Sequence, residues 1–287
     1  MKKILIHLEA GSKASVFDQV TAYDAGVDHV LAYGGVAPKE VTNLVYGAMF
    51  TRGGENLKNT AIFIGGENVP EAEKLMKEAQ GAFFGDVRVS VMFDPNGSNT
   101  TAAAMVHKIA CGRDLKGKKA LIMAGTGPLG MRAAILLVRE GCQVYVSSRK
   151  LDRAQEAQQH ILKSHGIEIT PLQIAGQEDL AKILSEGINI VSCCGAPGIQ
   201  LMDLATWTVA PELEILADVN AVAPFGVEGI KIADNGRVLH GRQLYGPIAI
   251  GNLKMKVHKA AVKALFESNN KVMDFESIYE IAKAMGS

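Results

Sequence analysis

The chain has 287 residues, about twice the common size of a single domain, so its length predicts two compact units. Hydrophobic residues make up 48% of it and charged residues 21%, and this balance excludes an intrinsically disordered chain. Thirty Lys and Arg residues match thirty Asp and Glu residues, so there is no overall positive charge to attract nucleic acid or an anionic membrane.

The first residues lack the features of a secretory signal, because the apolar run Ile4–Ile6 is followed at once by His7 and Glu9. The most apolar later segment, Lys119–Val138, contains Arg132 and several glycines and therefore does not predict a membrane helix. We expect a soluble, cytoplasmic protein. Its four cysteines form no CxxC pair, which indicates reduced thiols rather than disulfides. No HxH or HExxH spacing occurs, so no metal site is expected.

The first part of the sequence alternates short apolar runs with helical patterns, a rhythm typical of a parallel sheet with crossover helices. Pro38 and Pro70 stand near the starts of two predicted helices, where a missing N–H costs little. Four strand–helix units are predicted, with strands at 4–8, 29–33, 60–64 and 88–93 and helices at 15–25, 38–50, 69–84 and 99–111.

The polar link Leu115–Lys119 is followed by the same alternation, which predicts a second domain. The predicted fold class is α/β, with two parallel-sheet domains separated by a cleft, the second of them of Rossmann type. Residues 1–113 with 251–287 are expected to form the first domain and residues 114–250 the second. The later strands are predicted at 120–124, 143–147, 168–172, 188–192, 214–217 and near 246–250, and two helices at 252–267 and 275–285.

A GxGxxG turn lies between the strand 120–124 and a helix that runs to about residue 140. Gly125 permits a tight turn, Gly127 lets the backbone approach a diphosphate, and Gly130 lets helix and strand pack closely. This context favours a dinucleotide site over a merely structural glycine turn. The residues expected at the cofactor are Gly125, Thr126, Gly127, Pro128, Leu129 and Gly130.

The position of the ribose-binding acid of NAD proteins, about twenty residues further on, is occupied here by Ser147, Ser148, Arg149 and Lys150. Hydroxyl groups and cations suit a 2′-phosphate, since Arg forms charge-assisted bonds to phosphate. The pattern therefore favours NADP. In the alternative interpretation Ser148 caps the next helix and the two cations are solvated, with Asp152 as a first-turn acid.

Two further turns, 192–198 and 218–224, follow strands of the second domain. Ligands of open α/β sheets collect beyond the carboxyl ends of the strands, so Cys194 and Asn220 are candidates for contacts with the cofactor, Asn220 with a carboxamide. Ordinary Gly/Pro turns are the alternative.

The first domain has a polar turn at 94–101 that holds more hydrogen-bonding groups than a helix cap requires. The excess indicates a ligand with amides and carbonyls, such as a pterin, and an elaborate cap is the alternative. The segment 65–68 and the pair Phe17 and Asp18 follow other strands of the same predicted sheet, so they are expected at the same edge.

Lys254 falls within the apolar stripe of the predicted helix 252–267. The opposite face carries Lys256, Lys259 and Lys263. An inward lysine costs desolvation unless it meets a ligand or an acid, so Lys254 is a candidate cleft residue and His258, one turn on, a candidate companion. A snorkelling or salt-bridged structural lysine is the alternative.

The chain resembles the NADP-dependent methylenetetrahydromethanopterin dehydrogenases of methylotrophic bacteria from end to end. The motifs that carry the resemblance are the segments 15–18, 51–54, 96–101, 125–130, 149–152 and 253–258.

The resemblance implies NADP on the second domain, a pterin substrate in the cleft, and a trimeric or hexameric homo-oligomer. It implies hydride transfer from the methylene bridge of the pterin to NADP, and it places the family's catalytic lysine in the last motif, at Lys254 or, with a shift, at Lys256. Alternatives are a methylenetetrahydrofolate dehydrogenase, with or without cyclohydrolase activity, and a non-catalytic NADP-binding subunit. The expected substrate-binding residues are Phe17, Asp18, Asp94, Asn96, Ser98, Asn99, Thr100 and His258.

Overall fold

The computed structural model describes residues 1–286 and divides the chain into two compact units. Unit 1 comprises Met1–Thr100 and Met255–Ala284, and unit 2 comprises Thr101–Lys254 with Met285 and Gly286. Unit 1 is thus built from two separate stretches of sequence. Helices α4 (Ser98–Ala110) and α9 (Pro247–Ala264) each contribute residues to both units.

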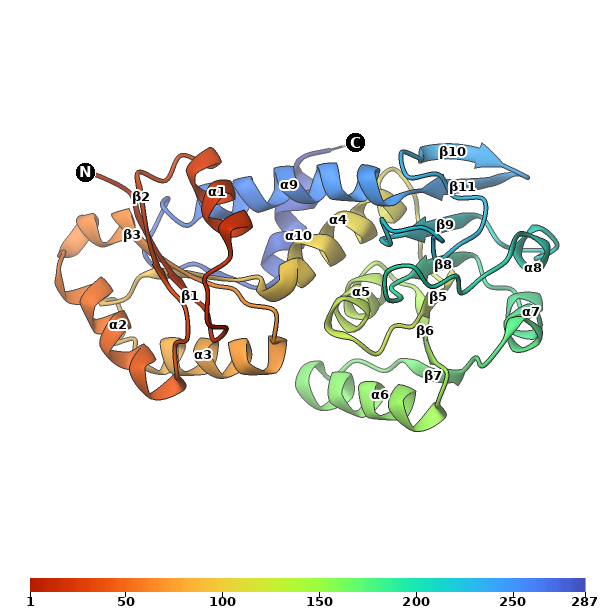
Figure 1. The fold of residues 1–287 in the computed structure, drawn as a ribbon, viewed down its shortest axis with the longest axis horizontal. Coiled ribbons are helices and arrows are strands. Elements are labelled where there is room, and N and C mark those ends of the chain that lie inside the picture. Colours follow the sequence, from red (N-terminus) through yellow and green to blue (C-terminus); the bar gives the residue numbers. More distant parts are fainter. Residues whose placement is uncertain (287) are drawn as a thin grey trace. The chain divides into compact units, whose positions relative to one another are not determined.

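Unit 1 is built on a five-stranded parallel sheet (Figure 1). Its order is β12-β4-β3-β1-β2, so the chain leaves β1 toward one side and then returns to place β3 on the other. The direction of winding therefore reverses between β1 and β3. The strands are β1 (Ile4–Leu8), β2 (His29–Tyr33), β3 (Thr60–Ile64), β4 (Ser90–Phe93) and β12 (Val272–Met273).

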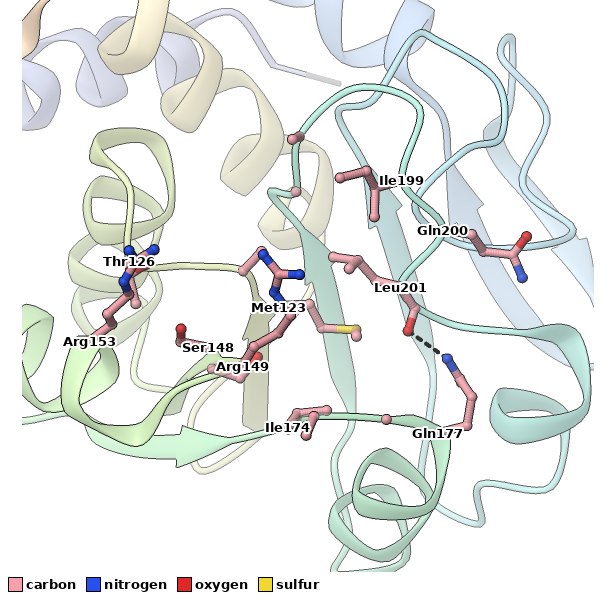
Figure 2. A pocket seen from close by; sticks show the side chains of 16 residues that line it. Met123, Thr126, Ser148, Arg149, Arg153, Ile174, Gln177, Ile199, Gln200 and Leu201 are labelled. Atoms are coloured by element: carbon pink, nitrogen blue, oxygen red, sulfur yellow. Dashed lines mark hydrogen bonds between the residues drawn. The ribbon is translucent and has the colours of Figure 1, made fainter.

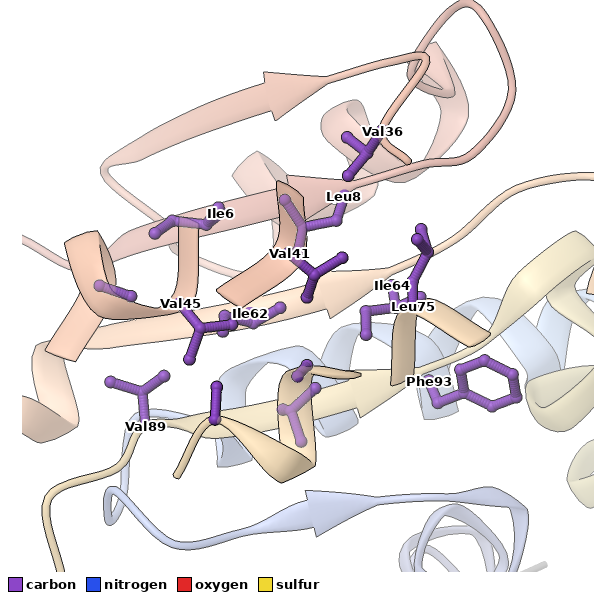
Figure 3. Close-up of a cluster of buried hydrophobic side chains, with 14 of the residues drawn as sticks. Ile6, Leu8, Val36, Val41, Val45, Ile62, Ile64, Leu75, Val89 and Phe93 are labelled. Carbon is purple, nitrogen blue, oxygen red and sulfur yellow. The ribbon is translucent and has the colours of Figure 1, made fainter. Parts of the chain in front are cut away.

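Helices α2 and α3 cover one face of this sheet. Alternate residues of β1, β3 and β4 point toward them and form the buried cluster of Figure 3, which includes Ile62 from the sheet, Val45 from α2 and Leu75 from α3. On the opposite face β3 packs against α9. The helices are α1 (Val16–Asp24), α2 (Pro38–Phe50), α3 (Val69–Gly81) and α10 (Phe275–Ala284), with short 3₁₀ turns at Gly54–Asn59 and Pro95–Gly97.

Unit 2 is built on a seven-stranded sheet of order β10-β11-β9-β8-β5-β6-β7. All pairs are parallel except β10 with β11. Without β10 the order is that of a Rossmann domain, so the predicted α/β class is confirmed. The strands are β5 (Lys119–Met123), β6 (Gln143–Ser148), β7 (Thr170–Gln173), β8 (Ile190–Cys193), β9 (Ile215–Asp218), β10 (Asn235–Leu239) and β11 (Arg242–Tyr245).

The core of unit 2 is a second apolar cluster that includes Leu121, Leu216 and the fully buried Trp207. The indole N–H of Trp207 donates to the carbonyl oxygen of Glu228 at 2.9 Å, so the largest buried side chain has its polar atom satisfied. The helices are α5 (Pro128–Arg139), α6 (Leu151–His165), α7 (Gln177–Ser185) and α8 (Leu204–Thr208). Within residues 1–286 no helix has the length and apolarity that crossing a membrane requires.

The predicted strand near 246–250 is wrong. Strand β11 ends at Tyr245, and helix α9 begins at Pro247. A short apolar run is compatible with a buried strand or a buried helix turn, and Pro at a helix start is favourable because its missing N–H is not needed there. The hairpin β10–β11 was not predicted, because polar residues such as Arg237 and Gln243 interrupt its apolar pattern.

Replacing Leu75 by Ala is expected to lower the free energy of unfolding by about 2–5 kcal/mol, because the side chain is 0% exposed and its loss leaves a cavity. Urea unfolding followed by circular dichroism measures the effect. The matched control is Leu162→Ala on the exposed face of α6, for which a change within about 0.5 kcal/mol is expected. Equal effects of the two substitutions would contradict this account of the core.

Candidate functional site

The glycine turn after β5 has the close packing that the sequence predicts. A Cβ on Gly130 would lie 2.4 Å from the Cα of Gly125, and a Cβ on Gly125 would lie 2.7 Å from Cγ2 of Ile122. No atom lies within 4 Å of the corresponding point at Gly127, the N-cap of α5. The two outer glycines therefore let helix and strand pack, and the middle one leaves open backbone beside the helix N-terminus, where anions are stabilised.

A pocket of about 440 Å³ lies beside this turn, within unit 2 (Figure 2). Figure 2 shows Thr126, Ser148, Arg149 and Arg153 toward one side of it and Gln177 and Leu201 toward the other, with the Gln177 amide donating to the Leu201 carbonyl oxygen. The lining comes from the carboxyl ends of β5 and β6 and from the segments that follow β5, β6, β7 and β8. It consists of Met123, Ala124, Thr126, Ser147, Ser148, Arg149, Arg153, Ile174, Ala175, Gly176, Gln177, Gly195, Ala196, Ile199, Gln200 and Leu201.

The charge of this pocket is positive, because its lining includes Arg149 and Arg153 and no Asp or Glu. Ser148 does not cap α6. The N-cap is Lys150, and the Ser148 hydroxyl accepts the backbone N–H of Lys150 at 3.3 Å. Lys150 is exposed and is not part of the lining. The segment after β6 thus presents a hydroxyl and two guanidinium groups, a set suited to a phosphate.

Sequence reasoning missed Arg153 and Gln177. Arg153 lies in the first turn of α6, where the helix dipole favours acidic side chains. A cation at this position is unusual, and it was the feature of the sequence that could have indicated an anionic ligand. Gln177 begins α7 and reaches the pocket through the loop after β7, and no motif in the sequence marks it.

The loop after β9 is fixed by the fully buried Asp218. Its carboxylate accepts the backbone N–H groups of Asn220 at 2.9 Å and Val227 at 3.0 Å. Burial raises the pKa of Asp218, and these hydrogen bonds oppose that rise. The Asn220 side chain is engaged within the loop, donating to the Pro224 carbonyl oxygen and accepting from the Val222 N–H. Its contact with a cofactor stays a prediction.

Burial raises the pKa of the Cys194 thiol to about 12 and raises the pKa of the Cys193 thiol well above its usual range. Both side chains are therefore neutral thiols at neutral pH, and neither is a nucleophile there. The pocket lining includes Gly195 but not Cys194, so a role of Cys194 at the cofactor also stays a prediction.

The polar turn of unit 1 is an internally bonded helix cap. Asp94 accepts the backbone N–H groups of Asn99 at 2.9 Å and Thr100 at 3.0 Å, and the Thr100 hydroxyl at 2.6 Å. Ser98 donates to the Pro95 carbonyl oxygen at 2.7 Å. This arrangement matches the cap interpretation. Two features exceed it: the exposed Asn96, with φ of 54°, and the side-chain oxygen of Asn99, which is buried and has no hydrogen-bond partner among residues 1–286.

His258 on α9 joins this turn. Its side chain is 0% exposed and stacks on Phe63, with ring centroids 5.6 Å apart and an interplanar angle of 15°. Its Nδ1 lies 3.7 Å from Oδ2 of Asp94. The ring centroids of His258 and the half-exposed Phe17 lie 6.4 Å apart. The structure thus brings Phe17, Asp94 and His258 together within unit 1.

Lys254 has the inward position that the helical pattern predicts. It is 9% exposed, and its neighbours in the stripe, Leu253 and Val257, are buried. Lys256 and Lys263 are exposed. Burial thus distinguishes Lys254 from Lys256 as the lysine that needs a partner.

No functional role was predicted for His7 and Glu9, which lie at the end of β1. Both side chains are buried, and His7 Nε2 lies 3.6 Å from Oε2 of Glu9. Burial lowers the pKa of His7 to about 4 and raises that of Glu9. Two titratable residues at the end of an apolar strand were the available signal, and nothing in their spacing marked a known motif.

The strand order, the glycine turn and the cationic pocket define a protein whose Rossmann unit binds a dinucleotide. Comparison with known proteins agrees with this class. A family model described as "Methylene-tetrahydromethanopterin dehydrogenase, N-terminal" matches residues 16–96. The "Bifunctional protein MdtA" of Methylorubrum extorquens is 43% identical over 286 residues, which are 99% of each chain. The "NAD(P)-dependent methylenetetrahydromethanopterin dehydrogenase" of the same organism is 29% identical over 98% of each chain.

The chain therefore belongs to the methylenetetrahydromethanopterin dehydrogenase family of oxidoreductases. Solved structures share its fold at low identity. Quinate dehydrogenase from Corynebacterium glutamicum in complex with NAD matches with a TM-score of 0.50 and 14% identity over 99% of each chain. A chorismate mutase/shikimate 5-dehydrogenase fusion protein from Clostridium acetobutylicum matches with a TM-score of 0.51 and 11% identity, over 99% of this chain and 97% of the other.

Replacing Arg149 by Gln is expected to weaken binding of NADP by about 10- to 100-fold, since a hydrogen bond to a charged group contributes about 1.5–3 kcal/mol. Binding of NAD, which lacks the 2′-phosphate, is expected to change less than about threefold. Calorimetric titration with both nucleotides measures the difference. The matched control is Lys163→Gln, an exposed cation near the C-terminal end of α6, which does not line the pocket. An equal loss for NAD and NADP would contradict a role of Arg149 at the 2′-phosphate.

Proposed function

We propose that the protein transfers a hydride from methylenetetrahydromethanopterin to NADP, giving the methenyl pterin and NADPH, in the one-carbon (formaldehyde) metabolism of methylotrophs. One observation carries the proposal: a chain of this family has a glycine turn whose pocket is lined by two arginines and no acid. The C–H bond of the methylene bridge breaks, its electron pair moves with the hydrogen, and the bridge is left as a methenyl cation. No separate proton transfer is required.

The residues of unit 2 fit a phosphorylated dinucleotide. The open backbone at Gly127 and the N-terminus of α5 suit the diphosphate, and Arg149 and Arg153 with Ser148 suit the 2′-phosphate. When bound, NADP supplies the hydride acceptor at C4 of its nicotinamide. The protein's contribution is to bind and orient the reactants and to exclude water. In a step without acid–base chemistry, this positioning is the main source of the rate acceleration.

Lys254 is proposed as the orienting residue of the active site. A cation is poorly placed against a developing methenyl cation, so its ammonium group is expected to bind a carbonyl oxygen of the pterin or a paired acid. Its burial on α9 supports this role, because an ammonium group removed from water requires such partners.

The protein is further proposed to act as a homo-oligomer, trimeric or hexameric, in the cytoplasm, where free cysteines stay reduced. The edge strand β2 supports the formation of an oligomer, because Leu31 and Tyr33 on it are exposed. Light scattering after gel filtration tests it, and a monomer at micromolar concentration would contradict it.

The test of the function is a spectrophotometric assay with NADP or NAD and with formaldehyde-loaded tetrahydromethanopterin or tetrahydrofolate. We expect methenyl absorbance and NADPH to rise together, fastest with tetrahydromethanopterin and NADP. A faster rate with tetrahydrofolate would favour the folate dehydrogenase instead, and subsequent loss of the methenyl product would add a cyclohydrolase activity. Binding of NADP without turnover on either carrier would leave a nucleotide-binding subunit.

Replacing Lys254 by Ala is expected to lower kcat/KM for the pterin at least about 100-fold, which corresponds to about 2.7 kcal/mol of transition-state stabilisation. Lys256→Ala, on the exposed face two residues on, is the matched control and is expected to stay within about twofold. The same assay measures both variants, and full activity of Lys254→Ala would refute the assignment.

A further inference from the structure

One wall of the pocket in unit 2 is the loop that follows β8. Figure 2 shows its residue Leu201, with Gln177, on the side of the pocket away from Thr126 and Arg153. A pocket binds more tightly when such a loop already has its bound conformation, because ordering a loop during binding costs free energy. The residues of the loop that line the pocket are Gly195, Ala196, Ile199, Gln200 and Leu201.

Two buried side chains lie at the base of this loop, Cys193 at the end of β8 and Asp218 at the end of β9. Both are 0% exposed, and neither lines the pocket. The two strands are paired with Cys193 opposite Asp218. The Cys193 thiol donates a hydrogen bond to the Asp218 carboxylate. A thiol is a weak donor, but in a site removed from water it helps to compensate the buried acid.

The Cys193 sulfur is also bonded to the wall of the pocket. It accepts the backbone N–H of Gly195, the first residue of the loop in the lining. A Cβ on Gly195 would lie 2.8 Å from Cδ1 of Leu201 and 3.9 Å from the Cβ of Ala124, both of which line the pocket. One buried sulfur atom therefore joins the acid to the start of the wall.

Gly226 forms a second connection, from the acid to the far end of the same segment. Its N–H donates to Asp218, and a Cβ there would lie 2.2 Å from Sγ of Cys193 and 3.1 Å from each carboxylate oxygen of Asp218. The Gly226 carbonyl oxygen accepts the backbone N–H of Leu201 at 2.8 Å. The Leu201 carbonyl oxygen accepts from the Gln177 amide at 2.9 Å. Both ends of the segment 195–201 are thus bonded to groups that contact the buried pair.

We propose that Cys193 and Asp218 are positioning residues of the dinucleotide pocket, which hold the segment 195–201 in its binding conformation without touching the ligand. This wall lies away from the cationic side of the pocket, so the pair acts on a part of the dinucleotide that NAD and NADP share. Loss of a connection therefore weakens both nucleotides by the same factor, whereas loss of Arg149 weakens NADP alone. The inference rests on the proposed function for the class of ligand, and it adds two residues to that function.

The first test removes the sulfur. Cys193→Ala loses both of its hydrogen bonds, and calorimetric titration is expected to show the Kd of NADP and that of NAD raised equally, by about 5- to 10-fold. Cys193→Ser has a hydroxyl that can donate to Asp218 and accept from Gly195, and its Kd values are expected to stay within about threefold of the wild type.

The matched control is Cys142→Ala. Cys142 is another buried thiol of unit 2, which donates to the Leu115 carbonyl oxygen at 3.7 Å and does not line the dinucleotide pocket. Its Kd values are expected to change less than about twofold. The inference is overturned by unchanged Kd values in Cys193→Ala, by a loss for NADP alone, by an equal loss in Cys142→Ala, or by a serine variant as weak as the alanine variant. Wild-type protein that binds neither nucleotide overturns it as well.

The second test keeps the thiol and changes the acid. Asp218→Asn preserves the volume of the side chain but removes one acceptor atom, so fixed N–H groups lose their partner. The Kd values of NADP and NAD are expected to rise together by at least about tenfold. Asp234→Asn is the matched control, because Asp234 is 5% exposed, accepts the Lys231 N–H at 2.7 Å and pairs with Arg237 outside the pocket.

Thermal unfolding separates positioning from stability in this pair of variants. Both substitutions are expected to lower the unfolding midpoint, and only Asp218→Asn is expected to change the affinity measured on folded protein well below that midpoint. Wild-type affinity of Asp218→Asn, or the same loss in Asp234→Asn, would overturn the inference. These titrations do not depend on turnover, so a wild-type protein that binds both nucleotides but transfers no hydride would overturn the proposed function and leave the positioning role standing.

Discussion

The shared direction of the strands in each unit is the constraint on which the candidate sites depend. Parallel strands deliver the loops that follow them to one edge of the sheet, however far apart those loops lie in the sequence. In unit 1 this edge receives Glu9, Gly65 and Asp94, and in unit 2 it receives Thr126, Arg149 and Gly195. The helices pack on the sheet faces, and they leave the loops at the edge available for ligands.

Both units use a buried aspartate to hold a functional loop. Asp94 follows β4 and accepts two backbone N–H groups and a hydroxyl of its own turn, and Asp218 ends β9 and accepts backbone N–H groups from a loop nine residues long. Each carboxylate is removed from water and is compensated by fixed donors, so the loop around it has one favoured conformation. Rigid loops of this kind suit a reaction in which the protein's task is to hold two ligands in a fixed orientation.

Much of the architecture follows from local pattern, and the selectivity of the sites follows from tertiary contacts. The apolar runs at 4–8, 29–33 and 60–64 are strands with those bounds, and the glycine turn lies where its spacing predicts. The pair Ser148 and Arg149 lines the pocket as expected, but Arg153 enters it through the helical turn that follows, which the strand-end pattern does not show. His7 lies in an apolar strand, and Gly65, fifty-eight residues away, comes beside it only through the pairing of β1 with β3. The excess of polar groups after β4 predicted a ligand, whereas most of them bond to one another, because spacing does not reveal where hydrogen bonds go.

The insertion of unit 2 between the two stretches of unit 1 sets the order in which the protein is completed during synthesis. The long stretch Thr101–Lys254 of unit 2 is available once Lys254 has left the ribosome, whereas unit 1 then still lacks the second half of α9, β12 and α10. Domains generally fold as units while the chain emerges, so the Rossmann unit matures while its neighbour is unfinished. During that interval β4, whose four residues are all buried in the finished protein, is an uncovered sheet edge. Such an edge is a template for pairing with another chain, and the arrival of two residues, Val272 and Met273, covers it.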